Sequence, residues 1–196
     1  MSDLFDEPDD AATPLSPEEK RDLIPSYIAF RSELNLAEQT NIAAGQAWAL
    51  ERRHPDLLSE RFIKNLHRRM LGDVWRWAGQ FRLSERNIGI DHWEVPEALR
   101  VLCDDTRTWI EHGSYPPDEI ALRFHHRLVQ IHPFPNGNGR HARLMADLLV
   151  AQLGGRPFTW GSQSLAEPGQ VRKLYVEALR HADRHDIKPL LAFARS

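Results

Sequence analysis

The chain has 196 residues, which suits a single domain with one sizeable core. Its net charge of −3 argues against general nucleic-acid binding, because domains that bind nucleic acids directly are usually basic. No apolar run approaches the length of about 18 residues that a membrane-spanning helix needs, and the acidic amino-terminus does not resemble a signal peptide. The single cysteine, Cys103, excludes an internal disulfide, so we expect a cytoplasmic protein.

Most of the chain carries a helical pattern of apolar residues. We expect residues 1–14 to be a disordered acidic arm and residues 15–196 to be one domain that includes an amino-terminal helix. A helix should begin at Ser16-Pro17, because Ser is a good N-cap and Pro suits the first helical position. Apolar spacing predicts further helices at 34–53, 59–71, 96–112, 117–131, 138–153, 168–182 and 186–194.

One stretch breaks the helical pattern. Residues 79–95 begin at a glycine and place β-prone side chains at alternate positions, which predicts a short β-hairpin that would form a flap. The expected fold class is therefore all-α, with one small β element.

The segment from His132 to Arg143 carries the chemistry. Pro133 and Pro135 oppose continuation of the preceding helix, while Gly137 and Gly139 permit a tight turn. A helix then starts at once, so its first N–H groups have no helical partner and point into the loop. A glycine-rich loop that enters a helix N-terminus is a ready anion site.

Charged and titratable side chains flank this loop. Arg140 and Arg143 lie at neighbouring positions of the helix, and each guanidinium can bind phosphate oxygens through two hydrogen bonds. His132 stands before the loop and can act as a base near neutral pH. The plainer interpretation is a capped helix with two solvated arginines. A Walker P-loop is excluded, because the Gly-Lys-Ser/Thr ending is missing.

The same segment, His132-Pro-Phe-Pro-Asn-Gly-Asn-Gly-Arg-His-Ala-Arg143, resembles the Fic motif, His-Pro-Phe-x-Asp/Glu-Gly-Asn-Gly-Arg-x-x-Arg. It departs from the motif at one fixed position, where Asn136 replaces an acid. Residues 66–82 and 116–131 also look like the flanking segments of Fic proteins, and the resemblance covers roughly residues 20–194. Within the Fic/Doc (Fido) family, the chain is most similar to small bacterial proteins called mobile mystery protein B. The implied fold is a Fic-type helical bundle with a flap.

The resemblance implies a protein adenylyltransferase that moves AMP from ATP to a hydroxyl group of a target protein. In that reaction His132 would be the catalytic base, and position 136 would hold the Mg²⁺ that bridges the ATP phosphates. Phe134 would anchor the loop. The implied nucleotide- and phosphate-binding residues are Gly137, Asn138, Gly139, Arg140 and Arg143.

Two other functions stay open. Related Doc proteins resemble kinases that pass on the γ-phosphate of ATP. A nucleotide-binding regulator with weak catalysis is the third possibility, because the amide of Asn136 is a poorer Mg²⁺ ligand than a carboxylate. The target protein would dock on the flap, near residues 84–95, where Asp91, His92 and Trp93 are candidate contacts.

Regulation is a further expectation from the resemblance. Many Fic proteins carry an inhibitory helix whose glutamate pairs with the second arginine of the motif. Glu38 stands at a comparable place and would compete with the γ-phosphate for Arg143, although the residues around it do not match the inhibitory pattern and a surface role is the alternative. A small inhibitory partner, such as the helix-turn-helix protein of a toxin–antitoxin pair, is the other candidate. A zinc site at His125 and His126 is disfavoured, because no HExxH pattern or cysteine cluster accompanies them.

Overall fold

A computed structural model describes residues 15–51, 53–162 and 168–196 of the chain. Within these ranges the fold is all-helical, with eight α-helices and one short 3-10 helix. None of the described helices is both long enough and apolar enough to cross a membrane. The expected disordered arm, residues 1–14, lies outside the described residues. The elements are α1 (Pro17–Asp22), α2 (Arg31–Leu50), α3 (Glu60–Leu71), η1 (His92–Glu94), α4 (Val95–Glu111), α5 (Pro117–Ile131), α6 (Asn138–Gln152), α7 (Pro168–Asp183) and α8 (Lys188–Ala194).

The helix boundaries follow from local sequence signals. Prolines stand at the start of α1, α4, α5, α7 and α8, where the missing N–H costs nothing. Ser59 caps α3, because its hydroxyl oxygen accepts a hydrogen bond of 3.1 Å from the Phe62 N–H. The predicted helix ends at Ile131 and the predicted start at Asn138 are both confirmed.

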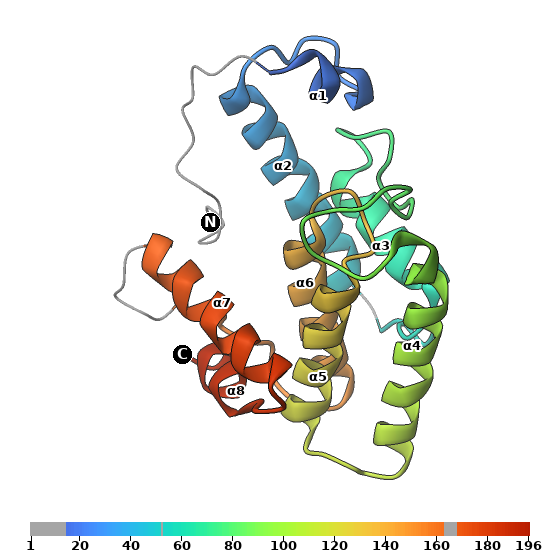
Figure 1. The fold of residues 1–196 in the computed structure, drawn as a ribbon, viewed down its shortest axis with the longest axis vertical. Coiled ribbons are helices and arrows are strands. Elements are labelled where there is room, and N and C mark those ends of the chain that lie inside the picture. The colour runs from blue at the N-terminus through green and yellow to red at the C-terminus, as the bar shows by residue number, and fades with distance from the viewer. Residues whose placement is uncertain (1–14, 52, 163–167) are drawn as a thin grey trace.

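The helices pack in pairs around α6. Figure 1 shows α5 and α6 side by side in the middle of the molecule, with α4 on one side and α7 and α8 on the other. The long helix α2 runs beside α3, and both contact α6. The site helix α6 is buried along nearly its whole length: Ala142, Met145 and Ala146 are fully enclosed. Helices that are hydrophobic on several faces belong in the centre of a core, so neighbouring helices fix the position of α6.

The predicted β-hairpin is wrong. Between residues 79 and 91 the described backbone forms turns and bends, and residues 92–94 form η1. The physical reason is the buried guanidinium of Arg82, which donates hydrogen bonds to the carbonyl groups of Ser84 (3.2 Å) and Ile90. In a β-hairpin these carbonyl groups would accept hydrogen bonds from backbone N–H groups of the facing strand. Here the Arg82 side chain takes the place of those N–H groups. An isolated β-bridge joins Leu23 to Trp75, outside this segment. We keep the name flap for residues 84–95.

Three imidazoles are fully buried in the bundle, and burial makes their charged forms unfavourable. Desolvation lowers the pKa of His67 to about 4 and that of His125 to about 3, and it holds the pKa of His141 well below its usual value. These side chains are neutral in the folded protein at neutral pH. In the unfolded chain they would take up protons near pH 6.5.

Acid should therefore destabilise the fold in a pH range set by histidine. As pH falls below about 6.5, the unfolded chain binds more protons than the folded chain, so the free energy of unfolding decreases until the folded pKa values are reached. Asp147 opposes this effect, because burial raises the pKa of its carboxyl group to about 6. His132, whose imidazole pKa is also lowered to about 4, adds to the loss. The expected net loss is roughly 4 kcal/mol between pH 7 and pH 5.5, measured by urea unfolding.

Two variants check the assignment of this loss to buried imidazoles. His125→Phe should reduce the loss by roughly 1 kcal/mol, because one titrating group is removed from the unfolded chain. His112→Gln changes an exposed histidine and should leave the loss as it is. A free energy of unfolding that stays constant over this pH range would contradict the prediction.

Candidate active site

The candidate site is built where α5 ends and α6 begins. His132 is the C-cap of α5 and adopts the left-handed conformation, with φ 51° and ψ 60°. That conformation is uncommon for a residue with a side chain, and it turns the chain sharply into the loop 133–137. Its N–H still donates to the Leu128 carbonyl at 3.2 Å, so the turn stays attached to α5. His132 consequently stands at a fixed place beside the loop.

The far end of the loop forms the N-terminus of α6. Gly137 has φ 76° and is the N-cap, and a side chain there would collide with the Leu71 methyl group, 2.5 Å from the position of a Cβ atom. The first N–H groups of α6 have no partner within the helix. Glycine at this turn leaves those groups accessible, which is the arrangement expected of an anion site.

Asn138 closes the loop from inside. Its side-chain oxygen accepts the Phe134 N–H at 2.9 Å, and its amide nitrogen donates to the Phe134 carbonyl at 2.8 Å. The side chain is 3% exposed, so it is committed to holding the loop and only the backbone of Asn138 is left for a ligand. The predicted binding role of this residue is thus confined to its N–H group.

Phe134 and His67 fix the loop to α3. Phe134 is fully buried, and its ring stacks on the His67 imidazole with centroids 3.7 Å apart. The Gly79 N–H donates to His67 Nδ1 at 2.9 Å, so the proton resides on Nε2, which donates to the Asn136 carbonyl at 3.0 Å. A neutral imidazole with a pKa of about 4 can fill both roles at neutral pH. His67 therefore links Gly79, which precedes the flap, to the loop.

Arg140 and Arg143 lie one turn apart on α6 and differ in surroundings. The Arg140 Nη2 atom is 3.0 Å from the Glu38 carboxylate, which comes from α2. Arg143 is 8% exposed, and its guanidinium lies 5.9 Å from the centre of the Tyr175 ring. Glu38 was expected to face Arg143, and the ion pair found here is with Arg140.

Glu38 is held in place from a second direction. Its other oxygen accepts a hydrogen bond of 2.6 Å from the Trp75 indole N–H, and the residue is 7% exposed. A carboxylate this deeply buried needs such partners, because it is costly to remove from water. The alternative of a solvated surface glutamate does not describe this side chain.

His132 is neutral at physiological pH. Burial, together with the positive charges of Arg82 and Arg86, lowers the pKa of its imidazole to about 4, while a hydrogen bond with the Val129 backbone opposes the shift. A neutral imidazole can accept a proton. An anionic ligand in the adjacent loop would raise this pKa and make the ring a stronger base.

Asn136 is exposed, and its side chain is directed toward the loop. The side-chain oxygen accepts the Gly137 N–H at 2.7 Å. No cluster of three histidine, cysteine or acidic side chains with metal-binding geometry occurs among the described residues. At position 136 a hard cation such as Mg²⁺ could bind one neutral amide oxygen. An aspartate or glutamate at this position would also attract the cation by its negative charge.

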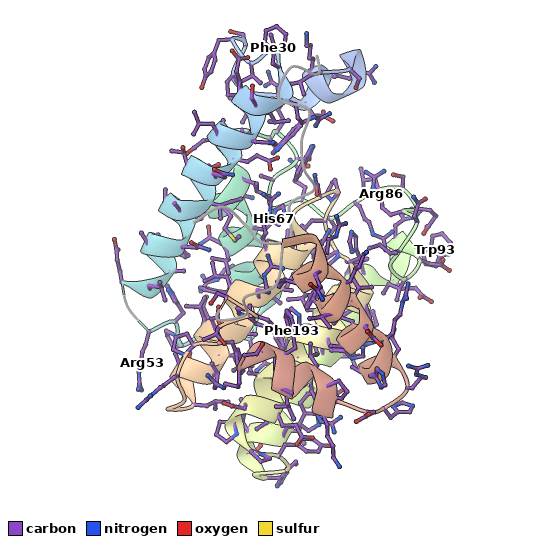
Figure 2. The ribbon with its side chains drawn as sticks, turned by 90° about the vertical axis from the view of Figure 1, so that its left-hand side faces the viewer. Phe30, Arg53, His67, Arg86, Trp93 and Phe193 are labelled. Atoms are coloured by element: carbon purple, nitrogen blue, oxygen red, sulfur yellow. The ribbon has the colours of Figure 1, made fainter. Side chains whose placement is uncertain are left out.

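Arg82, which precedes the flap, contacts the C-terminal end of α5. This side chain is almost completely buried and donates to the His132 carbonyl at 2.7 Å. The outer surface of the flap is mixed: the apolar side chains of Ile88 and Trp93 are 60% and 65% exposed, among exposed charged residues such as Glu85 and Arg86. Figure 2 shows Trp93 and Arg86 projecting outward at the edge of the molecule, while His67 lies inside the bundle.

Comparison with known proteins agrees with this geometry. The Fic/DOC family matches residues 57–150, a range that includes α3, the flap and the loop between α5 and α6. The chain carries a Fic/DOC family domain. The protein adenylyltransferase Fic of Drosophila virilis is 35% identical over 136 residues, which are 67% of this chain and 26% of that protein. The chain thus spans about a quarter of the length of such relatives.

Solved Fic structures share the fold. Fic-1 from C. elegans superimposes with a TM-score of 0.62 at 27% identity, over 81% of this chain and 48% of that one. The BepC protein of Bartonella tribocorum, solved with bound AMPPNP, gives a TM-score of 0.67 at 14% identity, over 92% of this chain and 97% of that one.

Sequence reasoning missed two residues of this Fic domain. His67 follows the apolar pattern of α3, and nothing in its spacing indicates contact with a loop almost 70 positions away. Arg82 lies in a run interpreted as a β-strand, where arginine is usually solvated. One feature of the sequence could have pointed to them: both belong to residues 66–82, the flanking segment that resembles Fic proteins.

Proposed function

We propose that this protein is a Fic-type nucleotidyltransferase that transfers AMP from ATP to a hydroxyl group of a target protein. One observation carries the proposal: a neutral imidazole, His132, stands beside a helix N-terminus that also presents two arginines. The named relatives, protein adenylyltransferases that match most of this chain, support the same reaction.

The reaction follows from the placement of these groups. The target hydroxyl oxygen attacks the α-phosphorus of ATP while His132 accepts the hydroxyl proton. A new P–O bond forms, the bond between the α-phosphorus and the bridging oxygen breaks, and pyrophosphate departs with that electron pair. The Asn138 and Gly139 N–H groups, together with Arg140 and Arg143, would bind the phosphate oxygens and stabilise their charge. The Gly137 N–H donates to the Asn136 side chain in this structure, so it would reach a phosphate only if that side chain turned away.

Mg²⁺ fits this site only as a companion of ATP. Bound there, the cation would neutralise charge on the phosphates and help pyrophosphate leave. Asn136 is exposed at the edge of the loop, and its amide oxygen is the one protein ligand that position 136 can offer. The phosphates would have to supply most of the negative charge around the cation.

The flap is the proposed docking surface for the target. Exposed apolar side chains at Leu83, Ile88 and Trp93 could pack against an extended segment of the target protein. The carbonyls that Arg82 occupies are unavailable to that segment, so the remaining flap backbone would make the contacts. A cytoplasmic setting, where ATP is abundant, suits this activity.

Labelled ATP separates the proposed activity from its alternatives. With ATP labelled on the α-phosphate, we expect label in a target or in the protein itself, and with γ-labelled ATP we expect none. Retained γ-label would instead identify a Doc-like kinase. No incorporation of either label, with normal ATP binding, would identify a nucleotide-binding regulator and contradict the proposal.

The variant His132→Asn tests the base. Asparagine tolerates the left-handed backbone better than most residues but cannot accept the proton in the same way. We expect α-label transfer to fall by a factor of 10²–10⁴, the range typical of a lost general base, while calorimetry shows ATP binding to survive. Transfer at the wild-type rate would remove His132 from the mechanism.

The metal proposal predicts a high requirement for Mg²⁺. Replacing Asn136 by Glu adds a carboxylate at the loop edge, which should lower the half-saturating Mg²⁺ concentration and raise the transfer rate by about 5- to 30-fold, equivalent to about 1–2 kcal/mol. The measurement is a Mg²⁺ titration of the rate for both proteins with the same target. A variant that is slower at every Mg²⁺ concentration would refute the role of position 136.

We also propose that Glu38 restrains the site from α2. Its carboxylate pairs with Arg140, a guanidinium that the ATP phosphates would otherwise bind. Glu38→Gln keeps an acceptor for the Trp75 N–H and removes the negative charge. ATP should then bind roughly 10-fold more tightly by calorimetry, since a charge-assisted hydrogen bond no longer competes.

The control for this change is Glu51→Gln, which alters an exposed carboxylate at the other end of the same helix. ATP affinity should stay at the wild-type value in that variant. Unchanged affinity in Glu38→Gln would assign Glu38 a structural role, and a separate inhibitory partner, such as a small helix-turn-helix protein, would remain as the regulator.

A further inference from the structure

The Arg82 side chain binds the backbone on which the catalytic base stands. Its Nε atom donates to the His132 carbonyl at 2.7 Å, and one terminal nitrogen donates to the Ile131 carbonyl at 3.4 Å. The Arg82 backbone N–H donates to the Pro133 carbonyl at 2.9 Å. Three consecutive carbonyl groups at the end of α5 are thus held by a single residue.

The same guanidinium holds the flap. Its other terminal nitrogen donates to the Ser84 carbonyl at 3.2 Å, and the nitrogen shared with Ile131 also donates to the Ile90 carbonyl. The charge is partly balanced by the Glu85 carboxylate, 3.6 Å away and half exposed. A buried cation satisfied mainly by carbonyl groups imposes strict geometry on the peptides that face it.

Gly89 shows how closely the two parts meet. A Cβ atom at this position would lie 2.9 Å from the His132 Cβ and 2.8 Å from an Arg82 terminal nitrogen. Its φ of +111° is also one that side chains rarely adopt. The flap backbone therefore rests directly on His132, with no room for a side chain between them.

The backbone at His132 needs such support. A left-handed histidine costs free energy, and it persists only where the surroundings fix it. We propose that Arg82 is a positioning residue that fixes the His132 backbone and the flap in one geometry, so that a hydroxyl presented on the flap faces the imidazole. The effect of Arg82 on catalysis rests on the proposed function. Its role in connecting the flap to the loop does not depend on that function.

A lysine cannot replace this guanidinium. Arginine presents five N–H donors in a rigid planar fork, while lysine has one ammonium group on a flexible stem. If the role of Arg82 were only to supply positive charge near His132, Arg82→Lys would preserve it. If the role is geometric, Arg82→Lys and Arg82→Gln should be similarly impaired.

The activity test measures transfer and ATP binding separately. For Arg82→Lys and Arg82→Gln we expect kcat to fall roughly 100-fold, because misplacing a reacting group by about 1 Å has effects of that size. ATP affinity should stay close to wild type. Arg61→Lys, which changes an exposed arginine at the start of α3, outside the flap and the loop, should keep its activity. Normal transfer by Arg82→Lys would overturn the positioning role.

A second variant serves if the Arg82 variants do not fold. Gly89→Ala keeps Arg82 and pushes the flap away from His132, so kcat should fall while ATP affinity is retained. The matched control is Gly113→Ala: Gly113 also has positive φ, +58°, but no atom lies within 4 Å of its Cβ position. Equal effects of the two substitutions would show general backbone strain and overturn the proposal.

Hydrogen exchange keeps this inference separate from the proposed function. In the protein without ATP, Gly89→Ala or Arg82→Lys should speed amide exchange in two places together, at residues 84–91 and at residues 132–137, relative to Gly113→Ala. Faster exchange in both places, with no transfer by the wild type, would retain the positioning role and reject the reaction. Faster exchange confined to the flap would overturn the positioning role itself.

Discussion

The burial of α6 is the constraint on which the site depends. Its apolar faces are enclosed by α5, α3 and α2, so the helix has one position and its N-terminus has one direction. Burying a side chain such as Met145 stabilises the fold by about 1.5–3 kcal/mol, and several such contacts act along this helix. Because α6 is fixed, the end of the loop that joins it is fixed as well. An anion site needs this rigidity, because the N–H groups that bind the anion must be in place before the ligand arrives.

The loop is connected to its surroundings by few contacts, each with a definite partner. The Asn138 side chain forms hydrogen bonds with both the backbone N–H and the backbone carbonyl of Phe134. The Phe134 ring stacks on His67, which donates a hydrogen bond to the Asn136 carbonyl. These side chains are buried, so their hydrogen bonds are made in a medium where an unmet partner would be costly. His132 and Arg140 lie at the edge of the loop, where His132 contacts Gly89 of the flap and Arg140 pairs with Glu38 of α2.

Charge around the site is distributed by burial. The imidazoles of His67, His125 and His141 are kept neutral, because the core cannot solvate their charge. The cations that remain have specific partners: Arg82 faces backbone carbonyls, and Arg140 faces the carboxylate of Glu38. Positive charge is thus present beside a neutral His132 without protonating it, and the same charges help to keep its pKa low.

The sequence by itself determined the helical fold, the break between Ile131 and Asn138, and the residues of the loop. These depend on local rules: apolar spacing, prolines that end α5, and glycines that permit the turn. It was misleading for residues 79–95, where alternating side chains predicted a hairpin and the structure has bends. Only the tertiary structure decided that Arg82 would bind those carbonyls, that His67 would support Asn136, and that Glu38 would face Arg140. Each of these contacts joins residues distant in the chain or replaces a backbone partner by a buried side chain. Local sequence patterns cannot predict such contacts, because the partner depends on which groups are buried together in the fold.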